Sequence, residues 1–113
     1  MSTLRGRQGE AMAAQYLRKH GYDVIAANYH SRFGEIDLIA RKRKQIVFVE
    51  VKLRKNAAFA RAMEAVTVSK QDKLRKTALL WLAENPGDWD ARFDVIEIYT
   101  DTDELHHIEN AFC

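Results

Sequence analysis

The chain has 113 residues, of which 47% are hydrophobic and 30% are charged, with one Pro and five Gly. This composition is typical of a folded globular protein, and the length predicts a single domain over residues 1–113. The only cysteine is Cys113, which excludes an internal disulfide and a multi-cysteine metal site. No apolar stretch is long enough to span a bilayer, and the first ten residues lack the apolar centre of a secretory signal. We therefore expect a cytoplasmic protein with no membrane partner.

The charged residues are distributed unevenly, although the net charge is only +2. Residues 1–76 contain 17 Lys and Arg against 7 Asp and Glu, whereas residues 77–113 contain 1 against 9. Two interpretations are open at this point. The basic part could form a face that neutralises phosphates. Alternatively, the two parts could neutralise each other within the fold.

The first predicted elements are a helix and three strands. Residues 5–20 are rich in helix formers, and Gly21 follows at the position where a left-handed residue ends many helices. Glu10 shares the stripe of Ala13, Ala14 and Leu17, so we expect its carboxylate to point inward or along the core edge. Strands are predicted at 23–29, 35–41 and 46–53, with turn residues at 28–34. The last two strands form a hairpin that is apolar on both faces and therefore central in its sheet.

A second helix and two more strands complete the pattern. Residues 54–66 predict a basic loop, and Ser69 with Asp72 resembles the capping pair that begins a helix ending near Asn85. The buried stripe of this helix comprises Leu74, Ala78, Trp81 and Leu82. Strands follow at 92–99 and 105–112, the latter at an edge. The fold class is therefore α/β: a sandwich with a central mixed five-stranded sheet and two main helices, in the order α-β-β-β-α-β-β.

Two acidic residues stand out in the predicted central hairpin. A tight turn at Arg43 and Lys44 would place Asp37 and Glu50 opposite each other, with Cβ atoms about 5 Å apart. Two carboxylates at that distance in an apolar sheet repel each other, and a bound divalent cation would relieve this repulsion. Mg²⁺ suits the pair because it prefers oxygen ligands and is often held by one or two carboxylates. The spacing therefore predicts a metal site.

Lys52 and Val51 extend this predicted site. Lys52 follows Glu50 by two residues, so it lies on the same face and could position or deprotonate a water, or stabilise negative charge on a phosphate. Val51 would turn its side chain to the other face and offer its backbone carbonyl as an oxygen ligand. An alternative remains open, in which Glu50 and Lys52 form an ion pair without a catalytic role.

Several motifs resemble those of the bacterial YraN family. The most specific are GEIDLI at residues 34–39 and FVEVK at residues 48–52, in this order and spacing. The resemblance covers nearly the whole chain and includes Gly9-Glu10-Ala11, Tyr16-Leu17, Gly21-Tyr22, Asn28 and Arg92-Phe93-Asp94. The YraN family is similar to archaeal Holliday-junction resolvases and belongs to the PD-(D/E)XK nucleases, which have a restriction-endonuclease-like fold. Ile36 stands where the superfamily motif has proline.

The resemblance implies a role for each of the matching site residues. It makes Asp37 and Glu50 metal ligands, Lys52 the catalytic lysine, and Glu10 an accessory acid from the first helix. It also places Lys70, at the start of the second helix, where it suits a phosphate contact. The implied cofactor is Mg²⁺, for which Mn²⁺ would substitute.

We therefore expect a Mg²⁺-dependent endonuclease with DNA favoured over RNA, and the resemblance to resolvases suggests branched or structured DNA as a substrate. The sequence alone leaves open the choice between DNA and RNA and between duplex and branched substrates. Basic segments around the site would hold the nucleic-acid backbone, and the residues that we assign to this contact are Arg32, Arg43, Lys44, Arg54 and Lys55. The competing hypothesis is a non-catalytic nucleic-acid-binding module, or an accessory protein in DNA processing, that retains the nuclease fold. The sequence leaves open whether the chain forms a homodimer.

Overall fold

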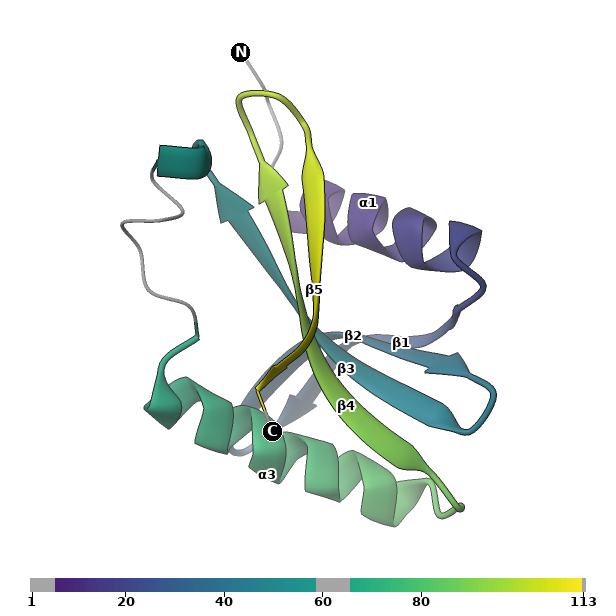
Figure 1. Cartoon of the computed structure of the whole chain (residues 1–113). Coiled ribbons are helices and arrows are strands. Elements are labelled where there is room, and N and C mark those ends of the chain that lie inside the picture. Colours follow the sequence, from purple (N-terminus) through teal and green to yellow (C-terminus); the bar gives the residue numbers. More distant parts are fainter. Residues whose placement is uncertain (1–5, 59–65, 113) are drawn as a thin grey trace.

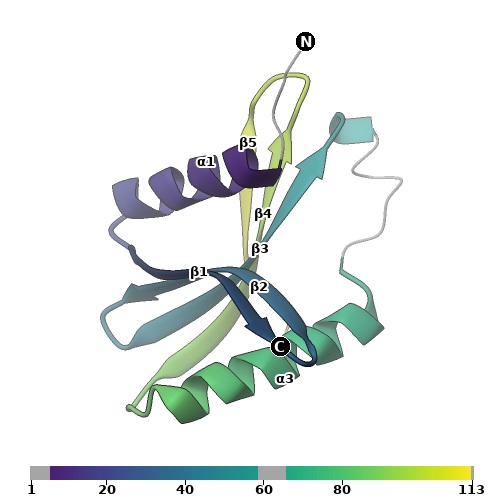
Figure 2. The same cartoon turned by 180° about the vertical axis from the view of Figure 1, so that it is seen from behind.

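A computed structural model describes residues 6–58 and 66–112. Five strands form one sheet in the order β1-β2-β3-β4-β5, in which only the β3–β4 pair is parallel. Helices α1 and α3 lie on opposite faces of the sheet (Figures 1 and 2). The predicted α/β class, element order and mixed sheet are confirmed. The bounds are α1 Gly6–Lys19, β1 Asp23–Ser31, β2 Gly34–Lys42, β3 Gln45–Arg54, α3 Val68–Glu84, β4 Asp90–Tyr99 and β5 Leu105–Phe112.

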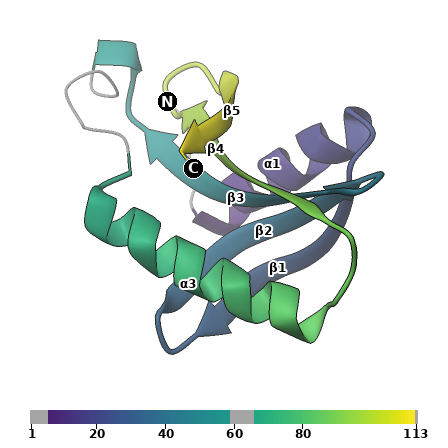
Figure 3. The same ribbon diagram turned by 60° about the horizontal axis from the view of Figure 1, so that its bottom comes forward.

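An apolar cluster fills each space between the sheet and a helix. On one face, the small stripe of α1 packs against alternate residues of the central strands. On the other face, α3 lies across β1 and β2 (Figure 3), and Trp81 packs edge-on against Phe48. The predicted core role of Trp81 is therefore confirmed. The central strands β2 and β3 are covered on both sides, as expected from sequences that are apolar on both faces.

The start of α3 differs from the prediction by two residues. Thr67 is the N-cap, with an extended backbone, and its hydroxyl accepts a hydrogen bond from the Lys70 N–H at 3.2 Å. The proposed Ser69 and Asp72 cap is wrong because both residues already lie inside the helix. Thr67 satisfies one of the backbone donors that every helix start leaves free. This cap also places Lys70 in the first turn of the helix.

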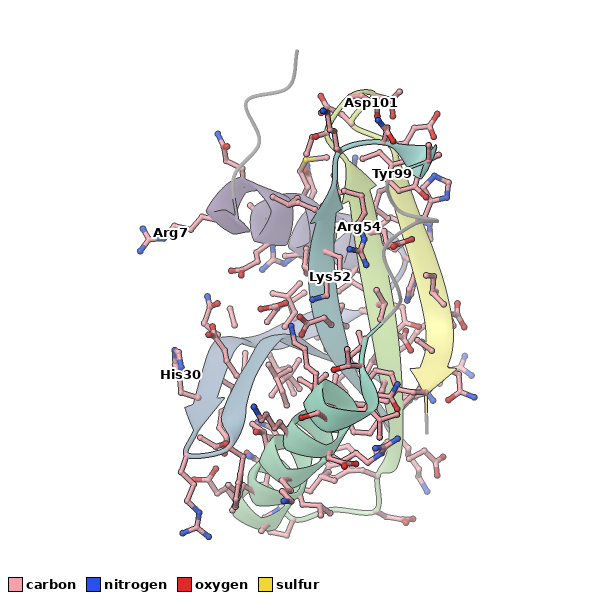
Figure 4. The ribbon with its side chains drawn as sticks, turned by 90° about the vertical axis from the view of Figure 1, so that its left-hand side faces the viewer. Arg7, His30, Lys52, Arg54, Tyr99 and Asp101 are labelled. Carbon is pink, nitrogen blue, oxygen red and sulfur yellow. The ribbon has the colours of Figure 1, made fainter. Side chains whose placement is uncertain are left out.

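The hairpin of β2 and β3 has the predicted register and the predicted turn at Arg43 and Lys44. The pairing ends at Leu38 and Val49, however. Beyond this point β2 pairs only with β1, and β3 pairs only with β4. We call this separation of β2 from β3 the fork; Figure 4 shows the β1–β2 ribbon turning away from β3 there.

Both edge strands are irregular. In β1 the register shifts between Val24 and Ala26, and Asn28 has a φ of 53°. The strand continues to Ser31, so the prediction of a turn from residue 28 onward is wrong. Asparagine tolerates this left-handed conformation better than most residues, which allows it inside a strand. In β5, Asn110 has a φ of 52°, and the pairing with β4 shifts between Phe93 and Val95.

The predicted basic loop at 54–66 lies only partly within the described residues. Arg54 ends β3, and residues 57–58 have helical backbone. Residues 59–65, and with them Arg61, lie outside the described part of the chain.

Candidate functional site

Asp37 lies at the fork, where its carboxylate replaces a missing backbone partner. Its Oδ2 accepts a hydrogen bond from the Val51 N–H at 2.8 Å, a donor that β2 no longer pairs. The prediction that Asp37 and Glu50 form a directly opposed strand pair is therefore corrected, because the pairing stops one residue pair earlier. In a strand, the N–H and C=O of one residue point toward the same neighbour. The Val51 carbonyl consequently faces the fork, as the predicted metal site requires.

Glu50 is buried, with 6% exposure, and it contacts two lysines. Its Oε1 lies 2.7 Å from Lys70 Nζ and 3.3 Å from Lys52 Nζ. Lys52 is thus on the same face of β3 as Glu50, as predicted, and Figure 4 shows it at the fork between the two helices. Lys70 reaches Glu50 from the first turn of α3, a pairing that the sequence analysis did not anticipate. Three elements therefore meet at this site.

Burial and neighbouring charges perturb the acid–base properties of this cluster. Burial, followed by the charge of Glu50, raises the pKa of Asp37 to about 6, although the Val51 N–H opposes the rise. Burial and the adjacent Lys70 lower the pKa of Lys52. Burial also disfavours the charged form of Lys70, but the contacts with Glu50 and Lys52 outweigh it and leave the Lys70 pKa raised. Lys52 is therefore the lysine of the pair that gives up its proton more readily.

Glu10 lies at the edge of the site on α1. It is half-buried, which agrees with the predicted position along the core edge. Its charge contributes to the raised pKa of Asp37. Among residues 6–58 and 66–112, however, no three His, Cys, Asp or Glu side chains come close enough to hold one metal ion. The side-chain ligands that the fork itself offers are therefore Asp37 and Glu50.

Asn28 is a residue at the fork that the sequence analysis placed in a turn. The pairs on either side of it join Ala27 with Leu38 and Tyr29 with Ile36, so Asn28 and Asp37 face each other without strand pairing. Asn28 also lines a groove with Glu10. An asparagine inside an otherwise apolar strand sequence was the available signal, because asparagine favours the left-handed conformation that such an irregularity needs.

Two of the predicted nucleic-acid contacts lie far from the fork. Arg43 and Lys44 form the turn of the hairpin, and Arg43 is six residues along the chain from Asp37, or about 20 Å at strand spacing. Lys44 lies 3.6 Å from Asp88 at the surface. These residues do not belong to the same cluster as Asp37.

The other three predicted contacts differ in exposure. Arg32 is exposed in the β1–β2 turn, with its guanidinium 4.8 Å from the ring centroid of Phe33. Lys55 is exposed just after β3. Arg54, in contrast, is buried, and its Nε lies 3.1 Å from Oε2 of Glu97. Burial in this ion pair gives Arg54 a structural role. Of these three residues, Arg32 and Lys55 are the two whose side chains are exposed to solvent.

A second charged network, centred on Asp94, holds the edge strand β5. Asp94 accepts hydrogen bonds from Arg92 at 2.8 Å and from the Asn110 N–H at 3.0 Å. His107 Nε2 lies 2.6 Å from the same carboxylate, and His107 Nδ1 contacts the Tyr16 hydroxyl at 3.1 Å. Burial raises the pKa of Asp94, but the bonds from His107 and Arg92 outweigh it and lower the pKa. This network ties α1, β4 and β5 together.

Comparison with known proteins assigns the chain to a family. The model of the uncharacterised protein family UPF0102 matches residues 9–98, which include the complete fork. The chain belongs to the UPF0102 family. A UPF0102 protein of Syntrophomonas wolfei is 44% identical over 110 residues, covering 95% of this chain and 96% of the relative. One of Caldanaerobacter subterraneus is 45% identical over 113 residues, covering 95% and 93%. A third, of Nocardia farcinica, is 47% identical over 94 residues, covering 82% and 74%.

The family match agrees with the resemblance drawn from the GEIDLI and FVEVK motifs, since both motifs lie inside the matched residues. In this UPF0102 chain the two motifs are the arms of the fork, the first on β2 and the second on β3. No helix in the described ranges is both long and apolar enough to cross a membrane.

Proposed function

We propose that this chain is a Mg²⁺-dependent endonuclease that hydrolyses phosphodiester bonds in DNA in the cytoplasm. The observation that carries the proposal is the composition of the fork. Two carboxylates and two lysines gather where an apolar sheet separates, and the pKa of Asp37 is raised to about 6. Burying charged groups costs stability, and such clusters of perturbed groups are common at functional sites. Branched or structured DNA is the substrate class that the family resemblance favours.

The donor atoms at the fork fit a hard divalent cation. Asp37 and Glu50 supply carboxylate oxygens, and the Val51 carbonyl faces the same space, which matches the oxygen ligands that Mg²⁺ and Mn²⁺ accept. The raised pKa of Asp37 shows that its ionised form is disfavoured in this environment. A cation beside it would remove that penalty. When bound, Mg²⁺ would supply positive charge to the phosphate and acidify a neighbouring water.

The two lysines have different roles in the proposed hydrolysis, because the pKa of one is lowered and the pKa of the other is raised. In hydrolysis, the oxygen of a water bonds to phosphorus while the bond from phosphorus to the oxygen of the leaving strand breaks, and that oxygen takes up a proton from solvent. Lys52 acts in its neutral form, which its lowered pKa favours; the Nζ lone pair orients this water and accepts its proton. Lys70, whose pKa is raised, stays charged and stabilises the negative charge that develops on the phosphate oxygens. Both side chains contact Glu50, which holds them at the fork.

Two alternatives account for less of this geometry. A purely structural ion pair explains Glu50 with its two lysines but not the half-buried carboxylate of Asp37, which accepts a hydrogen bond from the backbone N–H of Val51. A non-catalytic nucleic-acid-binding module needs basic side chains but no paired carboxylates. A divalent-ion titration separates this module from a nuclease, because an ion that binds a site in the folded state raises the melting temperature once its concentration exceeds its dissociation constant.

The deciding experiment is cleavage of labelled single-stranded, duplex, flapped and four-way DNA, and of RNA, with Mg²⁺, Mn²⁺ or EDTA. The parent is compared with Glu50→Ala and with Asp101→Asn, which changes an exposed carboxylate in the β4–β5 turn and serves as the purification control. We expect metal-dependent cutting of DNA by the parent and by Asp101→Asn, and none by Glu50→Ala. No cutting of any substrate, with salt-sensitive binding retained, would support the binding module instead. Equal cutting by Glu50→Ala would refute the site.

A further inference from the structure

A groove of about 460 Å³ runs between α1 and β1, next to the fork. It exists because α1 presents small side chains on this side, where Ala11 and Ala14 leave room that larger residues would fill. Leu38, the neighbour of Asp37 on β2, forms part of its floor. The polar groups that line the groove are Arg7, Glu10 and Arg18 from α1 and Asn28 from β1.

The two arginines stand at opposite ends of one helical stripe. Arg7 and Arg18 are eleven residues apart, which is three helical turns, so they share a side of α1 at a separation of about 16 Å. Both are exposed, and neither guanidinium makes an ion pair or hydrogen bond with another residue in the described ranges. With Glu10 between them, the groove carries a net positive charge.

The groove lies next to the fork, because Leu38 lines the groove and is also the residue at which the pairing of β2 with β3 ends. Figure 4 shows Arg7 projecting from α1 and His30 from β1 on the side where Lys52 lies at the fork. Glu10 is close enough to the fork for its charge to act on Asp37. A DNA backbone with one phosphate at the fork would therefore continue along the groove.

We propose that this groove holds the DNA strand on one side of the phosphate at the fork, with Arg7 and Arg18 each neutralising a backbone phosphate. The inference rests on the proposed nuclease function and extends it to a binding path. The arginines are about 16 Å apart. Because each nucleotide of a DNA strand rises about 3.4 Å, this separation corresponds to about five nucleotides. The amide of Asn28, exposed between them, donates a hydrogen bond to the same backbone.

Binding measured without metal tests the path independently of cleavage. The affinity of the full-length protein for a fluorescein-labelled DNA duplex is followed by anisotropy in EDTA over a series of NaCl concentrations. We expect Arg7→Gln and Arg18→Gln each to weaken binding by roughly three- to tenfold and to reduce the slope of log affinity against log salt by about 0.9. Lys19→Gln removes one charge from the exposed side of the same helix, away from the groove, and should change neither value.

A steric variant gives a readout that does not depend on charge. Ala11→Trp fills the groove from an exposed position, whereas Gln15→Trp adds the same bulk to α1 outside the groove. We expect only Ala11→Trp to weaken DNA binding while its melting temperature matches that of the parent. The groove inference is overturned if both arginine variants and Ala11→Trp bind as the parent does, or if Lys19→Gln lowers the salt slope equally. If instead the groove variants lose binding but the parent cuts nothing, the nuclease proposal fails and the groove stands.

Discussion

Replacing Asp37 by Asn should stabilise the folded chain at neutral pH when no divalent metal is present. The pKa of Asp37 is about 6 in the fold, above its ordinary value of 3.8. An acid whose pKa is raised by folding favours the folded state most below its unfolded pKa, and this contribution is lost as the pH rises through the folded pKa. At pH 7.5 the ionised carboxylate therefore opposes folding. Asparagine removes the charge and can still accept the Val51 N–H through its carbonyl oxygen.

The magnitude follows from the distance between the two pKa values. A rise from 3.8 to about 6 corresponds to at most about 3 kcal/mol of unfolding free energy. Asp37 is only partly buried, so solvent screening reduces the effect, and we expect a gain of roughly 1–2 kcal/mol. For a domain of this size, that gain raises the melting temperature by several degrees.

Urea unfolding in EDTA at pH 7.5 and pH 4 measures the effect directly. Asp37→Asn should be more stable than the parent at pH 7.5, and the difference should largely vanish at pH 4, where the folded parent carries a protonated Asp37. Glu109→Gln, an exposed carboxylate on β5, is the control and should change stability little at either pH. The reasoning is refuted if Asp37→Asn is no more stable than the parent at pH 7.5, or if its gain is the same at both pH values.

Three further predictions concern metal binding, the β5 network and the start of α3. Adding Mg²⁺ at about ten times its dissociation constant should stabilise the parent by about 1.4 kcal/mol and leave Asp37→Asn unchanged, which differential scanning fluorimetry can detect. Asp94→Ala should cost roughly 3–5 kcal/mol in urea unfolding, because Arg92 loses its buried partner. Since folding lowers the pKa of Asp94, its stabilising effect should be present above its unfolded pKa and be lost as the pH falls through the folded pKa, which an acid titration of the parent would show. Thr67→Ala should cost about 1 kcal/mol, whereas Thr67→Ser should restore the cap and most of that stability.

Local sequence rules predicted the hairpin and its register well. The polar turn at Arg43 and Lys44 between two apolar runs has few alternatives, and a shift of one residue would have moved every side chain of one strand to the opposite face of the sheet. The position of Glu10 on α1 and the core role of Trp81 also follow from helical periodicity alone. Such features depend on residues close together in the chain.

The fork could not be derived in the same way. It depends on β2 following β1 while β3 follows β4, and β4 lies beyond a complete helix in the sequence. The pairing of Lys70 with Glu50 likewise requires the packing of α3 against the sheet. Arg54 was assigned to a basic loop because residues 54–66 show no clear periodicity and carry several basic residues, yet its ion pair with Glu97 on the adjacent strand makes it part of the interior. Each of these differences arises from contacts between distant segments.

The irregular edge strands also affect how the protein behaves at high concentration. An exposed strand edge offers unpaired backbone groups to another chain, and regular edges promote aggregation. Here each edge contains an asparagine in the left-handed conformation, Asn28 in β1 and Asn110 in β5, which interrupts the row of groups that a second sheet would need. We expect replacement of Asn110 by Thr to increase light scattering during partial unfolding, whereas unchanged scattering would show that this edge is protected by other means. The left-handed backbone of Asn28, which lies at the fork, thus also hinders the pairing of β1 with a strand of a second molecule.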